Sequence, residues 1–259
     1  MITSLRKYWR IPGLAVVLVA VCSLASSADQ SSPSVVPPNA TVAGLTYGEW
    51  GGAWWQWLLP IPPCSSGPVD PNHPTACAGT SAPNLDTTGA SCGLNQAGPV
   101  WFLAGTAYDT SVFGTPTRAC TIPADKYIFL PIINLIDDWP CPSSFNFNPP
   151  PGKSLEDFLT NDANTLTQGV TTLEVEVDGV ALPQPFQYRA TSPLVGFTAN
   201  PGWVFNDPCI QEPQEVGVAD GYWLMLRPLS VGKHTLHFRG VNTLFNFTTE
   251  VTYQLKIKP

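Results

Sequence analysis

A regular alternation of apolar and polar residues near the C-terminal end constrains the fold more than any other feature of the sequence. Every second position from 245 to 257 belongs to one set, which is apolar except for Thr249: Phe245, Phe247, Val251, Tyr253, Leu255 and Ile257. The opposite set includes Thr252, Gln254 and Lys256. Neighbouring side chains of a strand point to opposite faces, so this pattern predicts a β-strand with one buried face and one face in water.

Several shorter segments upstream are also predicted to be strands. They are Val100–Leu103, Thr117–Ile122, Leu173–Val177, Gly221–Leu226 and Lys233–Arg239. Asp178-Gly179 is a strong hairpin-turn signal after the third of these, so Phe186–Ala190 is predicted as its return strand. The run Tyr127–Ile136 does not alternate. We expect it to be buried on both faces, with Pro131 marking an edge or a bulge.

Two helices are predicted. Thr46 and Glu49 have the spacing of a capping box, which begins a helix that Pro60 ends. One face of this helix carries Trp50, Trp54, Trp57 and Leu58, and Trp55 falls off that stripe. The stripe is expected to cover the sheet face that the partner sheet leaves free. A second helix begins after Ser154 and is closed by Gly169.

These elements predict a mostly β fold. Eight to ten short strands indicate a two-sheet antiparallel sandwich, jelly-roll or immunoglobulin-like, with an N-terminal Trp-rich helix and one further short helix. Twenty-eight prolines and 21 glycines argue against long helices. Residues 45–259 are expected to form a single domain, in which 60–98 is a loop region rich in turn-forming residues.

The first 28 residues are typical of a secretory signal peptide. A basic start is followed by the apolar stretch Gly13–Leu24 and by small residues up to Ala28. An uncleaved N-terminal anchor is the alternative, although the stretch is shorter than a membrane span. Cys22 also allows a lipoprotein signal, which the bulky Val21 before it disfavours. Residues 29–44 are expected to be a flexible leader, and the mature protein to be secreted or periplasmic.

Cysteine usage agrees with export. Six cysteines remain after the signal: Cys64, Cys77, Cys92, Cys120, Cys141 and Cys209. An even number in an oxidising compartment favours disulfides, and six cysteines allow 15 pairings. The sequence has no CxxC pair and its three histidines are scattered, so a zinc site is not expected.

The charge balance excludes some partners. The sequence has 12 basic and 19 acidic residues. Loss of the signal removes Arg6, Lys7 and Arg10, which leaves nine basic residues and a net charge of −10. Nucleic acid and anionic membrane surfaces are therefore not expected partners once the signal is cleaved. No cofactor is predicted; Ca²⁺ is possible for an acidic exported chain, although charge alone does not specify a site.

Six polar residues are candidates for a catalytic carboxylate or histidine site, or for Ca²⁺: Glu49, Asn134, Asp137, Asp138, Asp220 and His234. Each has a structural alternative. Glu49 can cap its helix, and Asp220 and the pair Asp137-Asp138 can lie in turns. His234 shares a strand face with Leu236, which favours a structural histidine in the core. The sequence lacks GxSxG, Walker and GxGxxG motifs.

Tryptophans are the other candidate functional residues, because flat rings stack on sugar faces. Trp50, Trp54 and Trp57 are expected to pack in the core. Trp139 and Trp203 lie among turn-forming residues and are predicted to form an exposed platform for a ligand.

Several segments of the chain resemble a family of uncharacterised exported bacterial proteins. They are Tyr47–Trp50, Trp54–Trp57, Gly98–Thr106, Cys120–Pro123, Pro131–Asn134, Asp220–Leu226 and Gly232–Phe238. Asp125 departs from the pattern, where a turn glycine is expected. The resemblance spans most of the mature chain and implies bacterial export, with no activity attached to it.

Two hypotheses of function follow. The first is an exported non-enzymatic module that binds an extracellular glycan or protein, or has a structural role. The second is a secreted hydrolase or lyase, which requires the six candidate polar residues to meet in one cleft.

Overall fold

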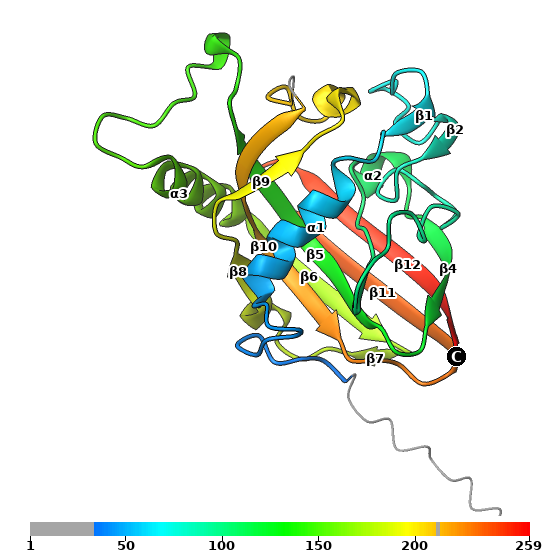
Figure 1. The fold of residues 1–259 in the computed structure, drawn as a ribbon. Coiled ribbons are helices and arrows are strands. Elements are labelled where there is room, and N and C mark those ends of the chain that lie inside the picture. The colour runs from blue at the N-terminus through cyan, green and yellow to red at the C-terminus, as the bar shows by residue number, and fades with distance from the viewer. Residues whose placement is uncertain (1–33, 211–212) are drawn as a thin grey trace, which may run out of the picture. The chain divides into compact units, whose positions relative to one another are not determined.

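The computed structural model describes residues 34–210 and 213–259, and the predicted signal peptide lies outside this part of the chain. Figure 1 shows two five-stranded sheets, and a small two-stranded hairpin beside them, built by the strands of the described residues. The predicted mostly β fold, with sheets packed as in a sandwich, is confirmed. No helix of the described residues is long and apolar enough to cross a membrane.

The first sheet has two long central strands. Its order is β3 (Val100–Phe102), β5 (Tyr127–Trp139), β10 (Gln214–Leu226) and β8 (Arg189–Thr191), and β9 (Val195–Thr198) also pairs with β10. The β3–β5 pair is parallel and the other pairs are antiparallel. β5 and β10 have 13 residues each, so they extend well beyond the three strands at their sides.

The second sheet holds the alternating C-terminal segment. Its order is β4 (Thr117–Pro123), β12 (Phe247–Lys258), β11 (Gly232–Asn242), β6 (Val170–Val177) and β7 (Val180–Ala181). Leu255 and Ile257 are buried and Gln254 and Lys256 are exposed, as the sequence predicts. β4 runs parallel to β12, and β3 runs parallel to β5. The expectation of purely antiparallel sheets is therefore wrong for these two pairs.

Helix α1 (Tyr47–Leu58) lies across the first sheet (Figure 1). The predicted capping box is present: the backbone N–H of Thr46 donates to Glu49 Oε2 at 2.8 Å, and that of Glu49 donates to Thr46 Oγ1 at 3.3 Å. A Cβ at Gly48 would collide with the carbonyl oxygen of Thr191. The absence of a side chain there therefore lets the helix pack closely on the sheet.

The opposite face of β5 and β10 is shared by two elements. The second sheet packs on one half, where Gly240 of β11 lies so close to Ile133 that a Cβ would not fit. Helix α3 (Leu155–Thr167) packs on the other half, with Leu159 and Ala163 against Val218. The Ser154 hydroxyl accepts the N–H of Asp157 and begins α3 as expected.

Pro131 marks a β-bulge. Tyr222 of β10 pairs with Ile133, but Trp223 pairs with Pro131, which leaves Ile132 as an extra residue in β5. A bulge increases the local twist and bends its strand. The predicted bulge is confirmed, and it separates the half of β5 that pairs with β3 from the half that extends beyond it.

Three disulfides connect Cys64 with Cys77, Cys92 with Cys120, and Cys141 with Cys209. Such bonds indicate an oxidising environment outside the cytoplasm. The first closes the hairpin of β1 (Cys64–Ser66) and β2 (Ala78–Ser81), and the second links the loop region 60–98 to β4. The short elements are α2 (Thr110–Phe113) and the 3₁₀ helices η1 (Ser143–Phe145), η2 (Pro185–Tyr188) and η3 (Pro201–Phe205).

Two further expectations are wrong. The return strand of the Asp178-Gly179 hairpin is β7, not Phe186–Ala190: Phe186 lies in η2, and β8, which follows, joins the other sheet. Proline at 185 favours a turn there over a ladder position. Residues 34–44 also pack on the domain instead of forming a flexible leader. Val36 is buried, and its N–H donates to Met225 O at 2.8 Å.

Candidate functional site

A cavity of about 430 Å³ runs along one edge of β5. β3 pairs with this edge only at Tyr127–Phe129, and no strand of the described residues pairs with it from Pro131 to Ile136. All six residues from Pro131 to Ile136 line the cavity, which we call the Trp cavity. An unpaired strand edge presents backbone donors and acceptors, so this wall can bind polar groups.

The rest of the wall comes from elements far apart in the sequence. α1 contributes one side, the loop after β3 and the β12 strand a second, and the η3 region a third. These lining residues include Trp54, Trp55, Leu58, Asn84, Thr106, Trp203, Asp207, Ile210, Phe245, Phe247 and Thr249. The cavity is therefore mostly apolar and aromatic, with a few polar groups, which is the usual composition of a small-molecule site.

Three polar atoms in this wall lack a partner. Trp55 Nε1, Asn84 Oδ1 and Asn134 Nδ2 are buried and have no hydrogen-bond partner among the described residues. Each such group costs about 1–3 kcal/mol when it is left unsatisfied. Two are donors and one is an acceptor, so the partners that they lack are of both kinds.

Trp55 differs from its neighbours in this respect. The indole nitrogens of four other tryptophans around α1 donate to backbone carbonyls at 2.8–3.0 Å: Trp50 to Val42, Trp54 to Leu103, Trp57 to Leu94 and Trp203 to Ile61. Buried indole N–H groups usually find such partners. Among the described tryptophans, Trp101 Nε1 also lacks a partner, but of these two residues only Trp55 lines the Trp cavity.

We infer that the mouth of the Trp cavity lies at the turn between β11 and β12. Phe245 lines the cavity and is 51 % exposed, and Leu244 beside it is 57 % exposed. At this turn the lining of the cavity reaches solvent.

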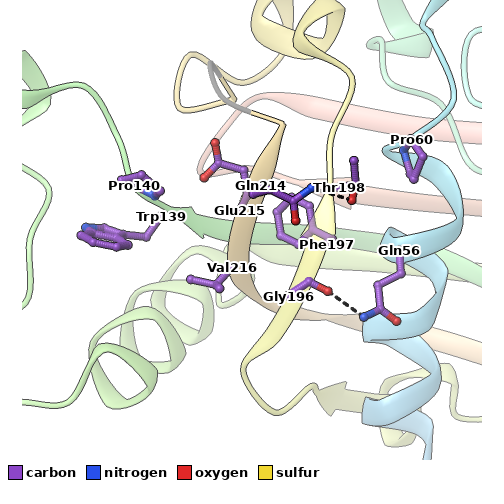
Figure 2. A pocket seen from close by; sticks show the side chains of 10 residues that line it. All are labelled: Gln56, Pro60, Trp139, Pro140, Gly196, Phe197, Thr198, Gln214, Glu215 and Val216. Carbon is purple, nitrogen blue, oxygen red and sulfur yellow. Dashed lines mark hydrogen bonds between the residues drawn. The ribbon is translucent and has the colours of Figure 1, made fainter.

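A second depression, of about 550 Å³, lies over the β9–β10 pair. Figure 2 shows that it extends from Gln56 of α1 and Pro60 just after it, across β9 and β10, to Trp139 and Pro140. Its amide side chains are already bonded: Gln56 Nε2 donates to Gly196 O at 2.8 Å and Gln214 Nε2 to Thr198 Oγ1 at 3.0 Å. The Trp cavity, with its unpartnered groups, is the stronger candidate for a binding site.

Carboxylates gather where β5 approaches the η3 region. Asp138 lies in β5 and is 3 % exposed, and one of its oxygens lies within 4.8 Å of an oxygen of Asp207. Burial, followed by the negative charges of Asp207 and Glu215, raises the pKa of Asp138 to about 9. With no cation beside it, this carboxyl group is therefore neutral at pH 7.

Asp137 points to the opposite face of β5. It is near Asp162 of α3, and burial together with that carboxyl group raises the pKa of Asp137 to about 8. Both aspartates lie in a strand, so the predicted turn at Asp137-Asp138 is wrong. β10 continues beside β5 at this point, and that pairing keeps these two polar residues extended.

The six candidate polar residues do not form one cleft. Glu49 serves the α1 cap, and Asp220 is fully buried in the middle of β10, where Arg189 pairs with it at 2.6 Å. The predicted turn at Asp220 is therefore wrong as well. His234 lies six residues along β11 from Gly240, which contacts Ile133, so it is about 20 Å from the Asn134 region by strand geometry.

His234 has structural partners instead. Its Nδ1 is 2.7 Å from Asp178 Oδ2 and its Nε2 is 2.9 Å from Ser230 O. These bonds join β11 to the turn after β6, in agreement with the structural interpretation of this residue.

The two predicted platform tryptophans occupy different places. Trp139 is partly buried and lines the depression of Figure 2. Trp203 is 2 % exposed, so its predicted exposure is wrong: it packs against Phe205 and lies in the wall of the Trp cavity. The surrounding turn-forming residues suggested a surface loop, but η3 folds back onto α1 and buries the ring.

Sequence reasoning missed two residues of the Trp cavity. Asn84 comes from the loop region 60–98, where no periodicity indicates burial. Trp55 gave one signal, its position off the apolar stripe of α1. Comparisons with protein-family models, with curated proteins and with solved structures gave no match to the chain.

Proposed function

We propose that this protein is an exported, non-enzymatic binding protein that holds a small uncharged ligand of saccharide type in the Trp cavity. The observation that carries the proposal is the set of three buried, unpartnered polar atoms, Trp55 Nε1, Asn84 Oδ1 and Asn134 Nδ2, in the wall of one aromatic cavity.

The composition of the wall supports this ligand class. A sugar ring has apolar C–H faces that stack on aromatic rings, and hydroxyl groups that both donate and accept hydrogen bonds. A purely apolar ligand would leave all three atoms unsatisfied. An anionic ligand would be repelled by Asp207, which lines the same cavity.

The size of the cavity sets a limit. About 430 Å³ lies within the range of small-molecule sites, so it suits one or two sugar units. A longer extracellular glycan would have to place its end in the cavity and leave by the mouth beside Phe245. The first hypothesis from the sequence is thereby narrowed from a surface platform to an enclosed site.

The alternative of a hydrolase or lyase receives less support. It required Glu49, Asp220 and His234 to meet the carboxylates of β5, and each of these three is bound to a partner elsewhere. A general acid and a general base must both reach one substrate, which this arrangement does not provide.

The experiment is a calorimetric and fluorescence titration of the mature protein with glucose, galactose, N-acetylglucosamine and their β-linked disaccharides. We expect at least one of these sugars to bind saturably and to change tryptophan emission. The proposal would be refuted if none of these sugars bound saturably.

Two variants and one control locate the site. Asn134→Leu and Asn84→Leu should weaken binding at least tenfold, because each removes a polar group that a ligand satisfies. Asn161→Leu, on the exposed face of α3, should bind like the wild type. Asn134→Leu removes an unsatisfied amide, so it should fold at least as stably as the parent, and its loss of binding would not reflect unfolding.

A further inference from the structure

Two carboxyl groups lie close together beside the Trp cavity, whose wall includes Asp207. Asp138 lies near the end of β5, and Asp207 follows η3; their nearest oxygens are within 4.8 Å. Asp207 is held in place because its Oδ1 accepts the backbone N–H of Cys209 at 2.9 Å.

Glu215, from a third segment, lies near Asp138 but outside the group of ligand atoms that are within 4.8 Å of one another. Asp138 pairs with Gly217 across the β5–β10 ladder, and Glu215 is two residues from Gly217, on the same face of β10. Residues in such a diagonal position are within reach of a long side chain. Glu215 is 4 % exposed, and its carboxylate interacts electrostatically with that of Asp138.

A disulfide connects the two segments that carry Asp138 and Asp207. The Cys141–Cys209 disulfide joins the chain three residues after Asp138 to the chain two residues after Asp207. Crowded carboxylates repel one another strongly when they are buried. The Asp138 side chain is 97 % buried, and its Oδ2 has no hydrogen-bond partner in the described part of the chain. None of the ion pairs in that part involves Asp138 or Asp207.

We propose that Asp138, Asp207 and Glu215 bind one divalent cation, and that Ca²⁺ is its natural occupant. Three carboxylates offer up to six oxygens, the hard ligands that Ca²⁺ takes. Cys209 Sγ lies in the same group but is oxidised in the disulfide, so it supplies no thiolate for zinc. The cation would fasten β5, β10 and the η3 region to one another at the wall of the Trp cavity.

The test uses the metal alone, without any sugar. Tb³⁺ binds at oxygen sites of the Ca²⁺ type, and tryptophans within energy-transfer distance make it luminescent. Trp139 follows Asp138 directly and Trp203 lies four residues before Asp207. We expect saturable Tb³⁺ luminescence on excitation of tryptophan, with one site per chain, displaced by CaCl₂ and far less by MgCl₂. A dissociation constant of about 10⁻⁴–10⁻³ M for Ca²⁺ is typical of extracellular sites.

Variants assign the site. Asp138→Asn and Glu215→Gln should each reduce the Tb³⁺ signal and the CaCl₂-induced rise of Tm at least tenfold, while Glu174→Gln on the wet face of β6 should leave both unchanged. If Asp138→Asn does not fold, Asp207→Asn replaces it, because Asp207 is partly exposed. The same loss of Tb³⁺ signal and of the CaCl₂-induced rise of Tm is expected. The proposal is overturned if CaCl₂ neither displaces Tb³⁺ nor raises Tm, or if the variants respond like the wild type. Sugar binding is measured separately, with Asn134→Leu as its variant. The two proposals can therefore be refuted independently of each other.

Discussion

Trp54 and Trp55 meet edge to face, with ring centroids 5.0 Å apart and planes at 88°, yet only one of them has a partner for its N–H. Trp54 Nε1 donates to Leu103 O at 2.8 Å, whereas Trp55 Nε1, of a residue that lines the Trp cavity, is buried without an acceptor among residues 34–210 and 213–259. The two residues are adjacent on α1, so their difference separates a structural tryptophan from one that is available to a ligand.

The first prediction compares Trp54→Phe with Trp55→Phe. Both changes replace an indole ring by a phenyl ring, but only the first breaks a buried hydrogen bond and leaves Leu103 O unsatisfied. We expect Trp54→Phe to lower the free energy of unfolding by about 2 kcal/mol more than Trp55→Phe. Urea denaturation measures the difference. Equal losses in both variants would mean that the N–H of Trp55 is satisfied in the folded protein.

The fold was largely predictable because its strongest signals are local. The capping box of Thr46 and Glu49, the alternation of β12 and the bulge at Pro131 all depend on neighbours in the sequence. Errors arose where a local signal was overridden by the rest of the molecule. Asp220 precedes a glycine and suggests a turn, but Arg189 supplies a charge that lets it stay in a buried strand.

A second prediction concerns Arg118, which is 1 % exposed. Its guanidinium donates to the carbonyls of Asp86, Ala104 and Gly105 and to the Tyr253 hydroxyl at 2.6–2.9 Å. Arg118→Met should lower the free energy of unfolding by at least about 3 kcal/mol, because the buried carbonyls of Asp86 and Gly105 lose their donor, while Ala104 O keeps the one from the Tyr253 hydroxyl.

Arg239→Met is the matched control for Arg118→Met. Arg239 forms only half-exposed ion pairs with Glu174 and Glu250 at 3.5 Å, so its loss should cost about 0–1 kcal/mol. Comparable losses in the two variants, measured by urea denaturation, would contradict the structural role given to Arg118.

The third prediction ranks the disulfides. In the chain-entropy model, removal of a cross-link costs more when the closed loop is longer. The separations are 68 residues for Cys141–Cys209, 28 for Cys92–Cys120 and 13 for Cys64–Cys77. Paired Cys→Ala variants should therefore lose about 4.5, 3.5 and 3 kcal/mol in that order. Thermal unfolding gives the ranking, and a reversed order would show that native-state contacts outweigh chain entropy.

The fourth prediction is a pH dependence at His234. Burial opposes its charged form, but the hydrogen bonds to Asp178 and to the Ser230 carbonyl outweigh burial and raise its pKa above 6.5. A raised pKa means that the folded state binds the proton more tightly. The stabilisation is complete below pH 6.5 and is lost as the pH rises through the higher pKa of the folded protein.

His234→Gln should remove this component from the curve of unfolding free energy against pH. Asp178→Asn should remove it too, and asparagine tolerates the positive φ of 53° at that position. If both variants keep the full slope of the wild type above pH 6.5, another group is responsible for it.

The candidate site was less predictable than the fold. Its wall is assembled from α1, the loop region 60–98, η3 and the turn before β12, and no sequence pattern couples segments so far apart. Asn134 was a candidate because it is a polar residue in a buried run. Its amide lies at an unpaired strand edge because β3 ends at Phe102, and the sequence of β5 does not indicate where β3 ends. Trp203 was predicted to be exposed because turn-forming residues surround it. It is buried because the position of η3 depends on the whole fold and not on the local sequence.

The most direct test of the central claim is the indole region of a ¹⁵N–¹H correlation spectrum of the mature protein, recorded during titration with the saccharide panel. The Trp55 signal is assigned by its disappearance in Trp55→Phe. We predict that it shifts saturably with a bound sugar while the Trp54 signal, tied to Leu103 O, moves little. A sugar that binds without moving the Trp55 signal, or a panel that moves no indole signal at all, would contradict the account.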